Sequence, residues 1–307
     1  MVSISSSKLI RDRTLKFCQN LKNWDLNNIL FKKVSAFLQN EYDIIPKKER
    51  NGKGMTYISK YAAKEMIQFL KSQIKNDKNI VEFGKEAFDY GDKIQNRNIQ
   101  HFALLFAAEV ILSNPKLFKF LVPLIEIWAD HEDWAIRETT SYTIIYGIKK
   151  DPKAVFPFLM NWTKSDNENL RRIVSESLRP MAEVKWLRDP KKNDKVVEIL
   201  TILNKDPSIY VRKSVGNNIK DLSKYMPEKI LDLMEQWIEN ANVKVHDKLA
   251  TEEGLSQEHK YLIWTIKQGM RWIKARNPEF HPRLEKILGK NYILYFDEKS
   301  NRLAKSR

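Results

Sequence analysis

Residues 162–178 read WTKSDNENLRRIVSESL: a tryptophan, a short polar turn, and an apolar residue eight positions after the tryptophan. An aromatic or leucine position, then an apolar residue eight positions later, recurs at Trp128 and Ile136, Leu203 and Val211, and Trp237 and Val245. The next residue is Arg137, Arg171, Arg212 or His246. A unit of two helices joined by a polar turn and repeated at this period is typical of an α-solenoid of the HEAT type.

The intervals between repeats are regular apart from one insertion. The first positions are 34, 41 and 34 residues apart, and the longer interval holds the stretch RPMAEVKWLRDPKKND at 179–194. Pro152, Pro207 and Pro227 fall near expected helix starts, where proline is tolerated. The alternative is a plain helical bundle with accidental similarity, and a register kept over four units argues against it. The predicted fold is all-α, a HEAT-like helical-repeat solenoid with a concave basic groove.

The region before the repeats also reads as helical, but it follows the pattern poorly. Amphipathic periodicity predicts helices at 8–22, 26–41 and 56–75, and the apolar run 101–112 predicts a buried helix. We therefore expect a divergent N-terminal helical region at 1–95, a repeat region at 96–290 and a C-terminal tail at 291–307.

The charge balance narrows the class of partner. The 307 residues include 54 basic and 39 acidic side chains, a formal net charge of +15. Such an excess favours a polyanion, with nucleic acid as the first candidate and an anionic membrane surface as the second. The alternative is a lysine-rich, solvated surface with no such partner.

The sequence gives no support for a disulfide, a metal or cofactor site, a signal peptide or a membrane span. Cys18 is the only cysteine, and none of the five histidines has a paired metal-ligand spacing, so we expect no disulfide, metal or cofactor. The N-terminus lacks the apolar core of a signal peptide, and no apolar run is long enough to span a bilayer. We expect a cytoplasmic protein, nucleoid-associated if it is bacterial.

The face opposite the core of each second helix is mainly basic. Counting from the apolar position as zero, positions 0, 4, 8 and 11 should face the core, and positions 2, 6 and 9 the opposite side. The latter are Glu138, Tyr142 and Ile145, then Arg172, Glu176 and Arg179, then Lys213, Asn217 and Lys220. Second helices line the concave surface of a HEAT-type array, so this stripe predicts a groove that holds a phosphate backbone.

Four residues do not fit a groove that only binds phosphate. The carboxylates Glu138, Glu176 and Asp221 repel phosphate, although each could simply pair with a neighbouring arginine or lysine. Trp134 lies one helical turn before Glu138 and has no equivalent in the other units. It could pack on the preceding turn as an ordinary half-buried tryptophan, or it could contact a ligand at the edge of the groove.

Three segments resemble the AlkC/AlkD superfamily of HEAT-like DNA alkylation-repair glycosylases. They are SDNENLRRIVSESLRP at 165–180, DPSIYVRKSVGNNIKDLSKYMPE at 206–228 and IWTIKQGMRWIKARNP at 263–278. The resemblance covers about residues 97–289, is greatest for the AlkC branch, and does not extend to the first 95 residues. It implies a cofactor-free enzyme that excises cationic N3- or N7-alkylated bases from double-stranded DNA, and a monomer.

The resemblance also implies roles by position. Trp134 matches an aromatic that lies against the damaged nucleotide, and Glu138 matches a catalytic aspartate, with Glu in its place. Glu176 and Asp221 match further carboxylates, so these three are the catalytic candidates. Trp134, Tyr142 and Asn217 are the lesion-contacting candidates. The DNA-backbone-binding candidates are Arg137, Arg171, Arg172, Arg179, Arg212, Lys213, Asn218 and Lys220.

The chemistry accounts for carboxylates in a basic groove. A cationic alkylated base is already a good leaving group, and a negative charge near the sugar favours the oxocarbenium-like transition state. A tryptophan face attracts the cationic base or packs on the deoxyribose. We therefore predict a monofunctional glycosylase for 3-methyladenine, with 3-methylcytosine or 7-methylguanine as further substrates. The alternatives are a non-catalytic DNA-binding relative for damaged, bent or branched DNA, and a HEAT scaffold for an acidic protein.

Overall fold

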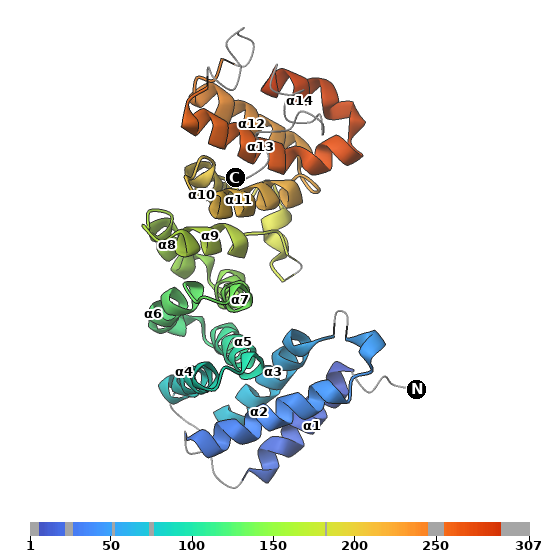
Figure 1. Ribbon diagram of the computed structural model, residues 1–307, viewed down its shortest axis with the longest axis vertical. Helices are drawn as coiled ribbons and strands as arrows, with labels where there is room; N and C mark the ends of the chain where they lie inside the picture. The colour runs from blue at the N-terminus through green and yellow to red at the C-terminus, as the bar shows by residue number, and fades with distance from the viewer. Residues whose placement is uncertain are drawn as a thin grey trace. The chain divides into compact units, whose positions relative to one another are not determined.

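The computed structural model describes residues 6–21, 27–50, 53–73, 77–181, 183–244 and 255–289. These residues form helices and connecting turns, with no strand among them (Figure 1). The chain divides into two compact units, 1–156 and 157–307, and each unit is described by itself.

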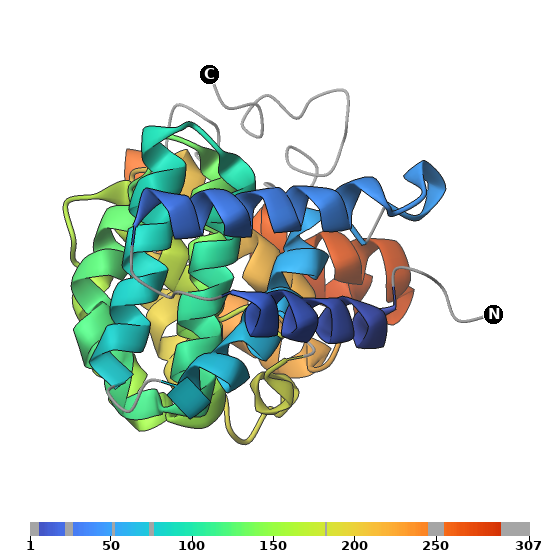
Figure 2. The same ribbon diagram turned by 90° about the horizontal axis from the view of Figure 1, so that it is seen from below.

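The first unit is built around a central buried helix. Its helices are α1 (Ser7–Asn20), α2 (Asn28–Asp43), α3 (Met55–Gln73), α4 (Asp77–Lys93), α5 (Arg97–Ser113), α6 (Phe118–Ala129) and α7 (Trp134–Lys150). Helix α5 packs between α3 and α7 and is buried continuously from Ile99 to Ile111, as its apolar sequence predicts. The blue helices α1 and α2 lie crosswise to the green helices α6 and α7 in Figure 2.

The second unit continues the alternation of first and second helices. It contains most of α8 (Pro152–Trp162), then α9 (Glu168–Ser177), α10 (Asp194–Leu203), α11 (Ile209–Leu222), α12 (Pro227–Asn240), α13 (Gln257–Arg276) and α14 (His281–Leu288). Helix α11 packs between α9 and α13. The predicted insertion lies between α9 and α10 and includes a short 3₁₀ turn, Lys185–Arg188.

The repeat register is confirmed by the helix caps and by burial. Asp133, Asn167 and Ser208 stand three positions before the repeat zero, and each side chain accepts the N–H two residues on, which caps the following helix. The four first-helix positions Trp128, Trp162, Leu203 and Trp237 are buried. Val245 and His246, the second-helix positions of the fourth unit, lie outside the described residues.

The predicted core positions are buried with two exceptions. Leu170 is half-buried because it lies in the first turn of α9, and Met181 is half-buried because α9 ends before it, at Ser177. Two residues expected on the outward stripe are buried instead. Ile145 is 1% exposed and Glu176 is 6% exposed. Second helices of neighbouring repeats pack side by side, so the open stripe is narrower than a helical projection of one helix predicts.

The structure bears on some of the remaining sequence predictions, which concern membrane spans, the single cysteine and the domain boundaries. None of the described helices is long and apolar enough to cross a membrane. Cys18 is buried, and burial raises the pKa of its thiol to about 12, with Glu65 adding to the shift. The tail at 291–307 lies outside the described residues, and the predicted boundaries at 95 and 290 remain predictions.

Candidate nucleic-acid interface

In three of the repeats, the arginine that follows the first apolar position of the second helix forms the same hydrogen bonds. The Nη1 group of Arg137 donates to the carbonyls of His131 and Glu132, at 2.6 and 2.8 Å. Arg171 makes the equivalent bonds to residues 165 and 166, and Arg212 to residues 206 and 207. These carbonyls belong to the turn between the two helices of a repeat. The arrangement found in all three repeats therefore holds the turn in place. DNA contact by these three arginines remains a prediction.

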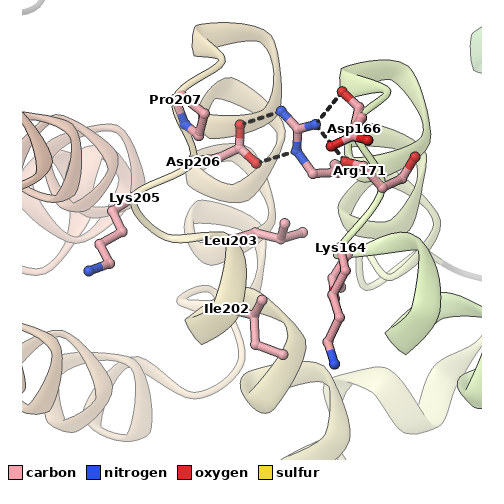
Figure 3. Close-up of a pocket in the computed structure, with 10 residues that line it drawn as sticks. Lys164, Asp166, Arg171, Ile202, Leu203, Lys205, Asp206 and Pro207 are labelled. Carbon is pink, nitrogen blue, oxygen red and sulfur yellow. Dashed lines mark hydrogen bonds and ion pairs between the residues drawn. The ribbon is translucent and has the colours of Figure 1, made fainter.

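Arg171 also connects two successive repeats. Its Nε and Nη2 groups donate to the two carboxylate oxygens of Asp206 at 2.7 and 3.0 Å, a bidentate pair (Figure 3). The pair closes a shallow depression between the turn 163–166 and the turn 203–207. Lys164 and Lys205 line the same depression but point away from the ion pair in Figure 3.

In the first unit, Trp134 is the first residue of α7 and is 65% exposed. It lines an open concavity with Gln95, Arg97, Gln100 and residues 131–133. The indole is therefore not packed as a core tryptophan, in contrast to Trp128. Glu138 and Tyr142 follow at one-turn intervals on α7 and are half-buried, so the three side chains share one helical face.

A polar cluster fixes the start of α7 beneath Trp134. Asp133 accepts the N–H of Ala135 at 2.9 Å and pairs with Arg97 at 2.6 Å. Burial opposes ionisation of Asp133, but these two partners hold its carboxyl pKa below the usual range. Behind it, His101 is buried, with Nδ1 2.7 Å from the hydroxyl of Thr139. Burial and the charge of Arg97 lower the pKa of His101 to about 4, so the imidazole is neutral at physiological pH.

In the second unit, Arg179 joins the two carboxylates that the sequence marked as catalytic candidates. Its Nη1 group donates to Glu176 at 2.6 Å, and Nε and Nη2 donate to Asp221 at 3.0 and 2.6 Å. Glu176 also accepts the hydroxyl of Ser214 at 2.9 Å. Both carboxylates are thus bound to cations, which is the salt-bridge alternative, and a catalytic role for either remains a prediction.

Lysines complete the surroundings of Asp221. Lys224 and Lys220 lie 2.7 and 3.1 Å from its second oxygen. Burial raises the pKa of Asp221, but hydrogen bonds from Lys224 and Arg179 outweigh it and hold the value at about 2.

The remaining candidates of the second unit differ in how open they are. The guanidinium of Arg172 lies 4.3 Å from the centre of the Tyr210 ring, and Lys213 is exposed on α11. Asn218 is buried, and its amide donates to the carbonyl of Ser175 at 2.8 Å, so it ties α11 to α9. Asn217 is half-buried and accepts a hydrogen bond from Arg271 at 2.8 Å.

Arg271 belongs to a basic row on α13 that the repeat pattern missed. Lys267, Arg271 and Lys274 stand at one-turn intervals, so they share one face of α13. The bond from Arg271 to Asn217 places this face beside the predicted DNA-facing stripe of α11. The sequence signal was the spacing of these three cations inside 263–278, a segment that the resemblance covered without assigning residues.

The comparisons with known proteins bear on this arrangement. The family model for DNA alkylation repair enzymes matches residues 62–257. The chain belongs to the DNA alkylation repair enzyme family. A curated relative, the uncharacterized protein YhaZ of Bacillus subtilis (strain 168), is 33% identical over 110 residues, which are 34% of this chain. The chain spans about 30% of the length of that relative.

Two solved structures share the fold. AlkD2 from Streptococcus mutans matches with a TM-score of 0.53 and 20% identity, over 79% of this chain and 98% of that one. Pseudomonas fluorescens alkylpurine DNA glycosylase AlkC, bound to DNA containing an abasic site analog, matches with a TM-score of 0.50 and 18% identity. That match covers 86% of this chain and 67% of AlkC. The helical-repeat fold of the AlkC/AlkD superfamily is therefore confirmed, and the closer relation to the AlkC branch remains a prediction.

Proposed function

We propose that this family member is a monofunctional DNA glycosylase that hydrolyses the N-glycosidic bond of cationic alkylated bases and leaves an abasic site. The observation that carries the proposal is the exposed indole of Trp134, one helical turn before Glu138, in a chain of the DNA alkylation repair enzyme family. This large aromatic leaves most of its surface uncovered in the free protein. It is available to a ligand instead.

The two side chains suit the two places that the positive charge occupies during the reaction, first the base and then the sugar. An alkylated base such as 3-methyladenine carries a formal positive charge, and the face of Trp134 attracts a cation held within about 6 Å. As the glycosidic bond breaks, positive charge develops on the sugar. The carboxylate of Glu138 stabilises that charge and orients the attacking water. As the water adds to the sugar carbon and the neutral base departs, the carboxylate accepts the proton that the water loses.

The remaining carboxylates serve a different purpose in this proposal. Glu176 and Asp221 hold Arg179 by three hydrogen bonds, so in the free protein they orient its guanidinium, and their catalytic role stays a prediction beside that positioning role. Cations in the same unit, including Arg172, Lys213 and Lys220, then contact the phosphate backbone of double-stranded DNA. The preferred base among 3-methyladenine, 3-methylcytosine and 7-methylguanine is assigned by the assay that follows.

Base release from methylated DNA tests the function. We expect the protein to free 3-methyladenine from genomic DNA treated with a methylating agent, measured by mass spectrometry. Glu138→Gln should lower release by about 100-fold or more while DNA affinity stays equal or increases. Glu198→Gln, an exposed carboxylate of α10 outside the concavity of Trp134, is the matched control and should retain full release. Full release by Glu138→Gln would remove Glu138 from the mechanism.

A non-catalytic DNA-binding protein is the second candidate function. The ion pairs of Arg179 favour it, because they occupy two of the three catalytic candidates in the free protein. This alternative expects tight, salt-sensitive binding to DNA and no release of any methylated base. The same assay, run with a binding measurement, separates the two functions.

A further inference from the structure

The concavity beside Trp134 is built from two turns that meet at the starts of α5 and α7. It is lined by Gln95, Arg97, Gln100, residues 131–133 and Trp134, and its volume is about 420 Å³. That volume lies within the range of small-ligand sites. The open indole in the lining suits a flat ring that stacks on it.

The charges of this lining favour a cationic ligand over a phosphate. Arg97 and Asp133 form an ion pair at 2.6 Å, so their charges largely cancel. Glu132 adds a carboxylate on an exposed side chain. The lining thus holds two carboxylates against one guanidinium, which attracts a cationic alkylated base and repels a phosphodiester.

Gln100 supplies a hydrogen-bond acceptor to the concavity. The residue is 5% exposed, and its Nε2 group donates to Asp92 Oδ1 at 3.1 Å. A carboxylate can only accept, so this bond decides which end of the amide faces Asp92. Asp92 is not part of the lining, whereas Gln100 is. The Oε1 atom of Gln100 is therefore the end left for a ligand, and it has no hydrogen-bond partner within the part of the chain that the structure describes.

His131 holds Asp92 in place. The backbone N–H of Asp133 donates to His131 Nδ1 at 3.0 Å, so the Nε2 atom carries the ring proton and lies 3.2 Å from Asp92 Oδ1. The ring also packs edge-on against Phe88, with ring centroids 5.9 Å apart. Two donors, Gln100 and His131, thus meet one carboxylate oxygen. Asp92 orients the Gln100 amide and is a positioning residue.

We propose that the alkylated base leaves the DNA stack, enters this concavity against Trp134, and donates its exocyclic amino group to Gln100 Oε1. The inference rests on the proposed function in taking an alkylated base as the ligand. Leaving the stack costs least for a damaged base. The stacked position on Trp134 also keeps the sugar close to Glu138, which follows one helical turn later on the same face of α7.

Gln100 is then a specificity-determining residue. Adenine carries an amino group at N6 and cytosine at N4, and both can donate to an amide oxygen. Guanine presents O6 at the corresponding place, and this acceptor repels the acceptor of Gln100. The site therefore favours 3-methyladenine and 3-methylcytosine over 7-methylguanine.

Single-turnover release from one sample of methylated genomic DNA tests how the amino group is read. The rate constant for 3-methyladenine, divided by that for 7-methylguanine, should fall about tenfold in Gln100→Met, because only the adenine loses a partner. Asp92→Asn should lower the same ratio, because an asparagine can donate to Gln100 and lets its amide turn. Gln68→Met, at an exposed glutamine of α3 outside the concavity, is the matched control and should keep the wild-type ratio.

Binding to DNA with a single unpaired nucleotide tests the same site without catalysis. Fluorescence anisotropy compares two short duplexes, one with a bulged deoxyadenosine and one with a bulged deoxyinosine. Their bases differ at one position, which carries an amino group in adenine and a carbonyl in hypoxanthine. Wild type should bind the deoxyadenosine duplex about fivefold more tightly, and Gln100→Met should bind both duplexes alike. A thermal unfolding curve establishes that each variant is folded.

Each outcome supports or overturns the inference. Equal affinity of wild type for the two duplexes overturns it, and so does a wild-type release ratio in folded Gln100→Met. Should Gln100→Met not fold, Asp92→Asn takes its place in both experiments, and wild-type values there overturn the inference. A preference for deoxyadenosine that the variant loses, with no release of any base by wild type, supports the base-reading site and contradicts the proposed glycosylase. The two proposals therefore fail in different experiments.

Discussion

Arg179 and Asp221 join the ends of α9 and α11 through two hydrogen bonds to one carboxylate oxygen, from Nε at 3.0 Å and from Nη2 at 2.6 Å. The third donor of the same guanidinium binds Glu176 at 2.6 Å. A rigid fork shared by two carboxylates orients the arginine far better than a single exposed ion pair does. The network therefore presents Arg179 in a fixed direction while it connects two repeats.

Asp221→Asn is expected to destabilise the second unit and to flatten its response to acid. The native carboxyl has a pKa of about 2, below the unfolded value of about 3.9, so its contribution is present above pH 4 and is lost as pH falls toward 2. After a discount for solvent screening, the contribution is about 1–2 kcal/mol. Urea unfolding between pH 2 and pH 6 measures it.

The control for this prediction is Asp232→Asn, which removes an exposed ion pair with Arg283. Exposed pairs contribute about 0–1 kcal/mol, so the control should stay close to wild type. Equal losses in the two variants would contradict a special role for the Arg179 network.

Arg171→Lys should be destabilising although the charge is kept. The lysine ammonium cannot reproduce the bidentate pair with Asp206 together with the two bonds to the turn carbonyls (Figure 3). We expect a loss of about 1–3 kcal/mol in the free energy of unfolding, because Asp206 is left buried and poorly paired. Lys164→Met, in the same depression, should change it by no more than about 0.5 kcal/mol. An unchanged free energy of unfolding in Arg171→Lys would show that the bidentate pair with Asp206 does not stabilise the protein.

His101 predicts a second, higher pH window in the first unit. Its native pKa of about 4 lies below the unfolded value of about 6.5, so the unfolded chain takes up the proton first. Stability should fall by up to about 3 kcal/mol as pH drops from 6.5 to 4. His101→Gln should remove much of this slope, and His281→Gln, a partly exposed histidine, should not. Unfolding curves collected across this range decide the matter.

The repeat could be predicted from the sequence because residues close together in the chain set its register. Spacing from Trp162 to Leu170, polar turns, and capping residues such as Asn167 all act within one unit. The sequence could not predict the contacts between neighbouring repeats. Ile145 and Glu176 lie on the predicted outward stripe, yet neighbouring helices bury them.

The candidate site, too, could be predicted from the sequence only in part. Trp134 could be singled out because no other unit has an aromatic at its position. The carbonyl partners of Arg137 could not be foreseen, since backbone carbonyls carry no sequence signal. For Arg179 the sequence offered a salt bridge to a carboxylate as one alternative, but it did not single out Asp221, which lies 42 residues away. The row on α13 escaped notice because its unit departs from the repeat spacing.

Trp134→Ala should separate the lesion contact from stability. The side chain is 65% exposed, so its loss should change the free energy of unfolding by no more than about 0.5 kcal/mol. A desolvated cation–π contact contributes about 2 kcal/mol, so base release should fall by roughly 30-fold. Trp134→Phe should restore part of the rate, and Phe120→Ala, another exposed aromatic of the first unit, should leave it unchanged. Single-turnover release of 3-methyladenine measures all three, and an unaltered rate in Trp134→Ala would leave the indole without a part in base recognition.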